Sequence, residues 1–129
     1  PTTFEELIKI SGLAHGTNVW TDNGECLIEK GVPASALPTL RDDIMNDLMS
    51  VGIDREIAYK MSDATRRGLF ARGKASDETV NLFKEVSKPL GDWYFDFCSK
   101  VRYMFPKAHA TIYVTYALYC ANLQHVVEI

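Results

Sequence analysis

The chain has 129 residues, of which 47% are hydrophobic and 24% are charged. This length suits one compact helical domain, residues 1–129, and the composition excludes a disordered chain. The formal net charge of −3 excludes a global positive field for nucleic acid, so any DNA contact must come from a local basic cluster.

A capping box predicts the first helix. The Thr3 hydroxyl can accept an early helix N–H while Glu6 reaches back, and apolar residues at helical spacing follow. Gly12 is expected to stop this helix, and a turn-rich stretch follows at residues 14–17. The sequence therefore places a loop around residue 15.

A short second helix is expected next. Asp22 is placed to cap it, the helix runs through Ile28, and Gly31 closes it. Residues 32–38 then carry two prolines and form a connector.

The next two helices have clear apolar faces. One begins at Pro38 or Thr39 and ends at Gly52, and the other begins at Asp54 and runs to Arg67. The residues at helical spacing behind these starts are Leu40, Ile44, Leu48 and Val51 in the first, and Ile57, Met61 and Ala64 in the second.

Two further helix starts are marked by capping residues. Ser76 to Thr79 begins a helix that Pro89 and Gly91 break, and Asp92 is expected to cap the next one, which Pro106 interrupts. The apolar residues behind these starts are Val80, Leu82, Phe83 and Val86, and then Trp93, Phe97, Val101 and Met104.

The most apolar stretch, residues 108–127, is expected to form a long buried helix. It does not suit a membrane span, because polar residues break it. No strand pattern or internal repeat is found. The predicted fold is all-α, with six or seven helices joined by connectors rich in Gly and Pro. The interrupting polar residues are His109, Asn122, Gln124 and His125.

The three cysteines, Cys26, Cys98 and Cys120, show no CxxC spacing. They fit reduced thiols in a cytoplasmic protein, and we interpret Cys98 and Cys120 as buried thiols rather than nucleophiles. No charged segment precedes an apolar one, so no signal peptide is expected. Pro1 leads straight into a helix signal, as expected of a chain cut from a longer protein.

Two segments are candidates for anion binding. His15 lies between Gly12 and Gly16, where exposed backbone N–H groups and an imidazole suit a phosphate or a base; the simpler alternative is a solvated turn. Arg41 begins a helix and is followed by two aspartates. Arg41 is placed to bind an anion, or alternatively to form an ion pair with one of these acidic neighbours. The two aspartates are better explained as complementing the helix dipole than as metal ligands.

Two basic clusters allow two interpretations each. Arg66 and Arg67 end a helix, with Arg72 and Lys74 beyond; they suit phosphates, or else helix C-terminal cations in a solvated loop. The second cluster surrounds the aromatic segment 103–106. In one interpretation the cluster binds a nucleotide or a single strand, with rings that stack on bases and cations that hold phosphates. In the other, the aromatic segment is buried in the core and the charged side chains lie outside it. Its members are Lys100, Arg102, Lys107 and His109.

Three blocks of sequence resemble the fingers region of the PolC-type DNA polymerase III alpha subunit. The first block is residues 1–20, the second is 40–45, and the third is 101–110, with the Trp-Tyr segment 92–94 before the third. The blocks stand in the family's order and at about its spacing, so the resemblance covers nearly the whole chain.

The resemblance implies a parent enzyme that extends primed DNA from deoxynucleoside triphosphates (dNTPs) with Mg²⁺. The catalytic carboxylates of the family lie in its palm, outside this segment, so Asp42 and Asp43 do not take that role and the chain alone is expected to be inactive. The residues implied for the nucleotide are His15, Gly16, Arg41, Lys107 and His109; those for the pocket wall are Gly12, Ala14 and Phe105; those for DNA phosphates are Arg66, Arg67, Arg72, Lys100 and Arg102.

The chain also departs from the family. Ala14 replaces a usual Ser, which removes a hydroxyl donor, and Asn18 replaces a usual Asp. Residues 111–113 and 124–129 do not resemble the family's continuation.

Two functions follow as expectations: a polymerase segment that contacts dNTP, primer–template DNA and other polymerase domains, or a free-standing non-catalytic helical interaction module. Exposed apolar faces, from Trp93, Phe95 and the tyrosine-rich last helix, would favour a dimer of the isolated chain.

Overall fold

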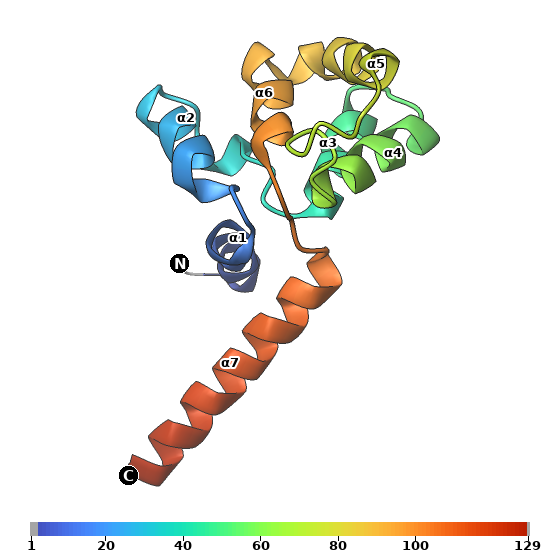
Figure 1. Ribbon diagram of the computed structural model, residues 1–129. Helices are drawn as coiled ribbons and strands as arrows, with labels where there is room; N and C mark the ends of the chain where they lie inside the picture. The colour runs from blue at the N-terminus through green and yellow to red at the C-terminus, as the bar shows by residue number, and fades with distance from the viewer. Residues whose placement is uncertain (1–2, 129) are drawn as a thin grey trace.

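The computed structural model describes the backbone of residues 3–128 and the side chains of residues 3–123; the expectations for Pro1 and for residues 124–129 lie outside the described side chains. The described residues form seven α-helices and no strand, which confirms the all-α prediction. Figure 1 shows α2 to α6 gathered in a globular part, with α1 beneath them and α7 projecting away. The helices are α1 (Phe4–His15), α2 (Glu25–Glu29), α3 (Arg41–Ser50), α4 (Arg55–Arg66), α5 (Asp77–Ser87), α6 (Asp92–Lys100) and α7 (Lys107–Glu128), with short turns at Trp20–Gly24, Ala34–Ala36 and Lys88–Leu90.

Three predicted helix starts are confirmed, because each capping side chain accepts a backbone N–H from the first turn. The hydroxyl of Thr3 accepts from Glu6 at 3.1 Å, and the hydroxyl of Ser76 accepts from Thr79 at 3.2 Å. The carboxylate of Asp54 caps α4 in the same way. These starts are local, so the sequence alone determines them.

The prediction that Gly12 stops the first helix is wrong. α1 continues through Ala14 to His15 and is capped by Gly16. Gly12 is buried inside the helix, where an added Cβ atom would lie 2.7 Å from the carbonyl oxygen of Thr39. Glycine here lets α1 approach the segment before α3 closely, and it does not end the helix.

Two predicted caps are also wrong. Asp22 lies inside a π-helical turn at φ 58°, and α2 begins only at Glu25. Asp92 is the first residue of α6, and Gly91 occupies the capping position without a side chain to offer. Asp22 therefore lies before the capping position of α2, and Asp92 lies one residue after the capping position of α6. Gly31 follows the end of α2 with φ 97°, which agrees with its predicted closing role.

The start of α3 lies at Arg41, later than the predicted residue 38 or 39. The carboxylate of Asp43 accepts the backbone N–H of Thr39 at 3.0 Å and that of Leu40 at 3.1 Å. These two contacts hold the chain in a turn before the helix, as a capping box does. The helix therefore begins after Leu40.

Residues 101–106 are extended, so the prediction that the sixth helix runs on to the proline is wrong. α6 ends at Lys100. The backbone after α6 instead pairs with the loop that follows α1. The N–H of Thr17 donates to the carbonyl of Tyr103 at 2.8 Å, and the N–H of Arg102 donates to the carbonyl of Thr17 at 2.9 Å. The pairing satisfies backbone groups that a helix would have satisfied internally.

Two hydrophobic clusters hold the fold together. The larger one lies among the helices of the globular part, and the smaller one joins α1 to the first turns of α7. The larger includes Val19, Leu37, Ile44, Leu48, Ala58, Met61, Phe83, Tyr94, Phe97, Cys98, Val101 and Met104; the smaller consists of Ile8, Leu40, Ala110 and Val114.

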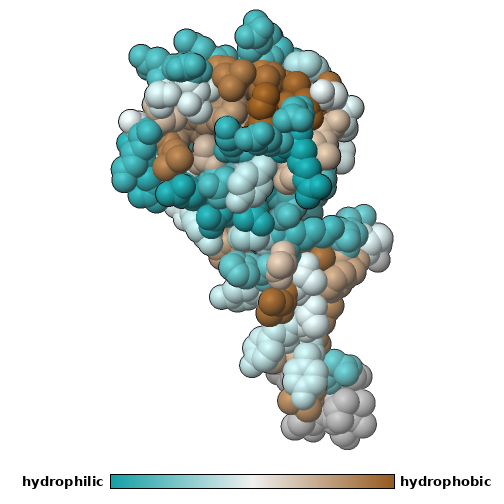
Figure 2. Space-filling view, turned by 90° about the vertical axis from the view of Figure 1, so that its right-hand side faces the viewer, coloured by the Kyte–Doolittle hydropathy of each residue, from teal (hydrophilic) through white to brown (hydrophobic). Residues whose placement is uncertain are grey.

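The expectation that the last helix is buried is wrong beyond its first two turns. Ala110 and Val114 pack against α1, but the helix then extends past it, and Tyr116 is 67% exposed. Figure 2 shows hydrophobic residues along this projecting part. Cys120 is exposed as well, whereas Cys98 is buried as predicted. None of the described helices combines the length and the apolarity that a membrane crossing requires.

Candidate functional site

The extended segment 101–106 is the point at which the three blocks meet. The carbonyl of Phe105 accepts the backbone N–H of Arg41 at 3.1 Å, which joins the third block to the second. Its pairing with Thr17 joins the third block to the first. Segments that are far apart in sequence are therefore fixed by backbone contacts around one corner of the molecule.

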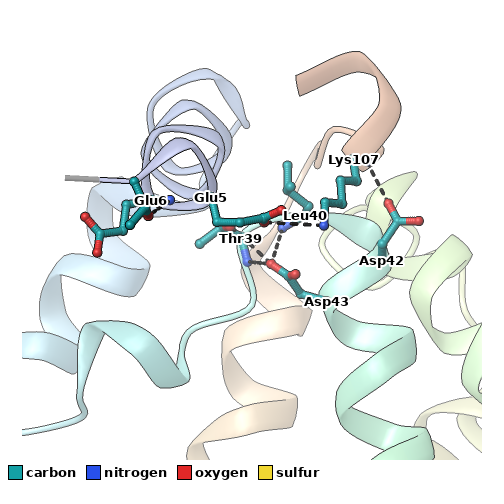
Figure 3. A network of polar contacts seen from close by, with 8 residues as sticks. Glu5, Glu6, Thr39, Leu40, Asp42, Asp43 and Lys107 are labelled. Atoms are coloured by element: carbon teal, nitrogen blue, oxygen red, sulfur yellow. Dashed lines mark hydrogen bonds and ion pairs between the residues drawn. The ribbon is translucent and has the colours of Figure 1, made fainter. Parts of the chain in front are cut away.

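Polar side chains join the same three blocks (Figure 3). The carboxylate of Asp42 accepts the backbone N–H of Lys107 at 2.6 Å, so a residue of α3 caps the start of α7. The ammonium group of Lys107 lies 3.4 Å from the carboxylate of Glu5 on α1. Both ends of that ion pair are well exposed, so its contribution to stability is small.

The guanidinium group of Arg41 lies beside this network and takes no part in its described contacts. Asp42 and Asp43 both accept backbone N–H groups, and no hydrogen bond or ion pair to the Arg41 side chain occurs within the described part of the chain. Arg41 is half-buried at the first position of α3. Its charge lies at the start of a helix, where the helix dipole also favours an anion, while the backbone N–H groups of Arg41 and Asp43 already donate to Phe105 and Leu40.

His15 lies in a cluster of aromatic rings. Its ring is stacked with Tyr113 at 5.8 Å between centroids and with Phe105 at 6.4 Å, and Tyr103 meets Phe105 edge to face at 5.3 Å. The Nδ1 atom of His15 lies 2.9 Å from the carbonyl oxygen of Ser11, which fixes the ring orientation. The cluster remains accessible, because His15 and Tyr113 are exposed.

The small residues of the first block differ in their surroundings. Gly12 faces Thr39, and Gly16 lies where a Cβ atom would meet the carbonyl oxygen of Tyr103 at 3.0 Å. These glycines make room for other parts of the backbone. Ala14 is exposed and lines an apolar groove between α1 and α7, whose other lining residues are Leu7, Ile10, Ser11, His15, Tyr113, Val114, Ala117 and Leu118.

Some predicted cations are engaged with carboxylates. Arg66 and Arg67 lie 3.4 and 3.7 Å from the two oxygens of Asp63, and Lys100 lies 3.1 Å from Asp96. These ion pairs, which neither interpretation of the two clusters included, satisfy part of their charge.

Other cations face solvent. Arg72 is exposed, and its guanidinium donates to the backbone carbonyl of Arg102 at 3.5 Å. Within the described residues, no partner occurs for the guanidinium of Arg102 or for the imidazole of His109, and both residues are exposed. Arg102 is therefore the most available of the predicted phosphate contacts.

Three ionisable groups outside this network are withdrawn from solvent: Tyr94 and Cys98 are buried, and Asp47 is half-buried. The Tyr94 hydroxyl donates to the carboxylate of Asp47 at 2.7 Å, and burial raises the pKa of both groups. Burial also raises the pKa of Cys98 to about 12, with a hydrogen bond to Thr65 opposing. The Cys98 thiol is therefore protonated at neutral pH and is not a nucleophile.

The described residues do not fit a magnesium site. No group of three or more His, Cys, Asp or Glu side chains among them is placed to hold an ion. Asp42 and Asp43 are adjacent, yet each carboxylate accepts backbone N–H groups from a different segment.

Two parts of this corner are not among the residues that the sequence predicts. Tyr113 stacks on His15 and Phe105, and the signal for it was the recurrence of aromatic residues after the third block. Asp42 caps α7 across 65 positions of sequence, and no local pattern reveals so distant a contact.

Comparison with known proteins agrees with the resemblance seen in the three blocks. The DNA polymerase III PolC-type of Staphylococcus epidermidis is 48% identical over 119 residues, and that of Staphylococcus aureus is 45% identical over the same length. Each match covers 92% of this chain and 8% of the relative. The resemblance to PolC-type DNA polymerase III is thereby confirmed, and the chain spans a small part of the relatives it matches. No protein-family model matches the chain.

Proposed function

We propose that this chain is a fingers segment of a replicative DNA-directed DNA polymerase, and that it contacts the incoming dNTP and the primer–template DNA. The observation that carries the proposal is the unpaired guanidinium of Arg41 at the corner where the three blocks meet. The matches to PolC-type DNA polymerase III support the same reading.

The corner offers two kinds of contact that a nucleotide needs. Arg41 provides positive charge at the start of α3, where the helix dipole also favours phosphate oxygens, and the exposed imidazole of His109 adds a ring nitrogen. The rings of His15 and Tyr113 are exposed, and both are stacked against the ring of Phe105. They provide aromatic faces on which a base can stack. Lys107 adds a second cation, although Glu5 shares it.

The chain supplies only part of a polymerase under this proposal. Mg²⁺ and the catalytic carboxylates belong to other domains of a cytoplasmic parent enzyme, so the chain alone does not extend DNA. A few cations without the metal ions leave most of the triphosphate charge unneutralised, so we expect a dissociation constant on the order of 1 mM for the isolated chain.

Replacement of Arg41 tests the proposal in a polymerase. A PolC-type relative would carry this chain in place of its matching segment, with Arg41→Ala compared with Arg55→Ala. Arg55 is a matched control, because it also begins a helix and is exposed. We expect Arg41→Ala to lower kcat/KM for dNTP by roughly tenfold or more, with primer–template affinity unchanged. A loss confined to DNA affinity would show that Arg41 does not serve the triphosphate.

A second candidate function is a free-standing, non-catalytic interaction module. The observation that favours it is the exposed apolar surface of α7, on which Ile112 is 66% exposed. Soluble proteins rarely leave such a surface uncovered.

A further inference from the structure

We propose that α7 binds α7 of a second copy of this chain in an antiparallel helix pair. The contact surface is the α7 stripe, which we define as Ile112, Tyr116, Tyr119 and Leu123. These residues are separated by four, three and four positions, the spacing of a coiled-coil seam. They are 66%, 67%, 63% and 51% exposed. The inference does not depend on the proposed polymerase function.

The α7 stripe lies on the side of the helix that α1 does not cover. α1 packs on Ala110 and Val114, which are buried. At about 100° per residue, the stripe lies nearly opposite those two residues around the helix. A shallow depression on the stripe side is lined by Thr111, Ile112, Thr115, Tyr116 and Tyr119. A partner helix can therefore bind without displacing α1.

The order of the residues favours a second copy over an unrelated helix. When two α7 stripes are aligned antiparallel, Ile112 of one copy faces Leu123 of the other, and Tyr116 faces Tyr119. Each aliphatic residue thus meets an aliphatic residue, and each tyrosine meets a tyrosine. An interface related by a two-fold axis needs this kind of self-complementary patch.

Charge and area also suit a pair of identical helices. Residues 108–127 contain no Asp, Glu, Lys or Arg, so two copies approach without repulsion along the seam. Four side chains of this size expose roughly 500 Å² in each copy, or about 1,000 Å² in a pair. This area is at the lower limit of a specific interface, so we expect a dissociation constant in the micromolar range.

The shape of the molecule favours the antiparallel orientation. α7 projects from the globular part, and its C-terminal end lies far from it (Figure 1). An antiparallel pair places the two globular parts at opposite ends of the seam, whereas a parallel pair places them side by side. The antiparallel orientation is also favoured by the opposed helix dipoles.

Sedimentation at increasing concentration tests the pairing. We expect a monomer–dimer equilibrium that the double variant Ile112→Lys/Tyr116→Lys weakens by at least tenfold. The matched control is Ala121→Lys, because Ala121 is exposed on the same helix but lies away from the stripe. Circular dichroism of each variant confirms that the fold is retained. A wild-type chain that stays monomeric overturns the proposal, as does a dimer that both variants leave equally strong.

Cross-linking tests the orientation independently. Chains carrying Cys120→Ser with Ile112→Cys are mixed with chains carrying Cys120→Ser with Leu123→Cys and oxidised. The antiparallel pair predicts the mixed disulfide above either homodimer, and the Cys120→Ser chain alone is the control for the remaining cysteines. Homodimers in excess would contradict the antiparallel pair. The proposal is also overturned if the chain is monomeric and the stripe variants lower the activity of the grafted polymerase. That result would show that the stripe binds another part of the enzyme and not a second copy.

Discussion

The carboxylate of Asp42 accepts the backbone N–H of Lys107 at 2.6 Å, although 65 positions of sequence separate the two residues. A side chain at the start of one helix thus caps the start of another. The contact fixes the direction in which α7 leaves the globular part, and it holds the second block against the third.

Asp42→Ala is expected to destabilise the fold through the loss of this cap. The free energy of unfolding should fall by about 1 kcal/mol, the usual effect of removing a capping side chain. Asp42→Asn retains an acceptor and is the control. Urea unfolding followed by circular dichroism measures the change, and equal stability of the alanine variant and the wild type would show that the Asp42 contact contributes nothing.

Gly68→Ala is expected to cost more stability than Gly73→Ala. Both glycines have φ 68°, so the cost of a left-handed backbone, about 1–2 kcal/mol, applies to each. Only at Gly68 would the added Cβ atom meet the carbonyl oxygen of Arg102, whereas nothing lies within 4 Å at Gly73. The thermal midpoints of the two variants measure the difference. Equal midpoints would mean that the backbone of Arg102 moves aside freely.

The hydrogen-bonded pair of buried Tyr94 and half-buried Asp47 predicts a pH dependence of stability. Burial raises the pKa of Asp47 in the folded chain, so that state holds a proton after the unfolded chain has released it. Stability therefore falls as the pH rises from about 4 through the raised pKa. Asp47→Asn keeps an acceptor for the Tyr94 hydroxyl and should flatten this slope, which urea unfolding across pH measures.

Asp47→Ala separates the hydrogen bond from the titration. It leaves the Tyr94 hydroxyl buried without its acceptor, so we expect a loss of about 1–3 kcal/mol. A wild-type slope that Asp47→Asn leaves unchanged would assign the pH dependence to another group.

Arg102 is expected to contribute to DNA affinity through phosphate charge. In the grafted polymerase, Arg102→Gln should weaken primer–template binding and lower the slope of log K against log salt by about 1. Lys60→Gln is the control, because Lys60 is an exposed cation on α4 that pairs with Glu56. Equal salt slopes in the two variants would remove Arg102 from the DNA contacts.

The sequence predicts the parts of this fold that depend on neighbours in the chain. The starts at Thr3, Asp54 and Ser76 are confirmed, since a cap and its N–H donor lie within three residues. Gly12 and the segment 101–106 are mispredicted because packing against distant backbone decides their conformation.

The candidate site divides in the same way. Arg41 and His15 are candidates that local patterns and the resemblance suggest. Their surroundings, the capping by Asp42 and the stacking by Tyr113, depend on how distant segments pack, which no local pattern encodes. The exposure of α7 is missed for a related reason, since an apolar helix has the same pattern whether or not a partner covers it.

The most direct test of the central claim is a titration of the isotope-labelled chain with a dNTP and Mg²⁺, followed through backbone amide shifts by NMR. We expect shifts that cluster at His15, Arg41 and residues 107–109 near millimolar nucleotide. The Arg41→Ala variant should show smaller shifts at the same nucleotide concentration. Shifts that are scattered over the surface, or that cluster away from the corner where the three blocks meet, would contradict the claim.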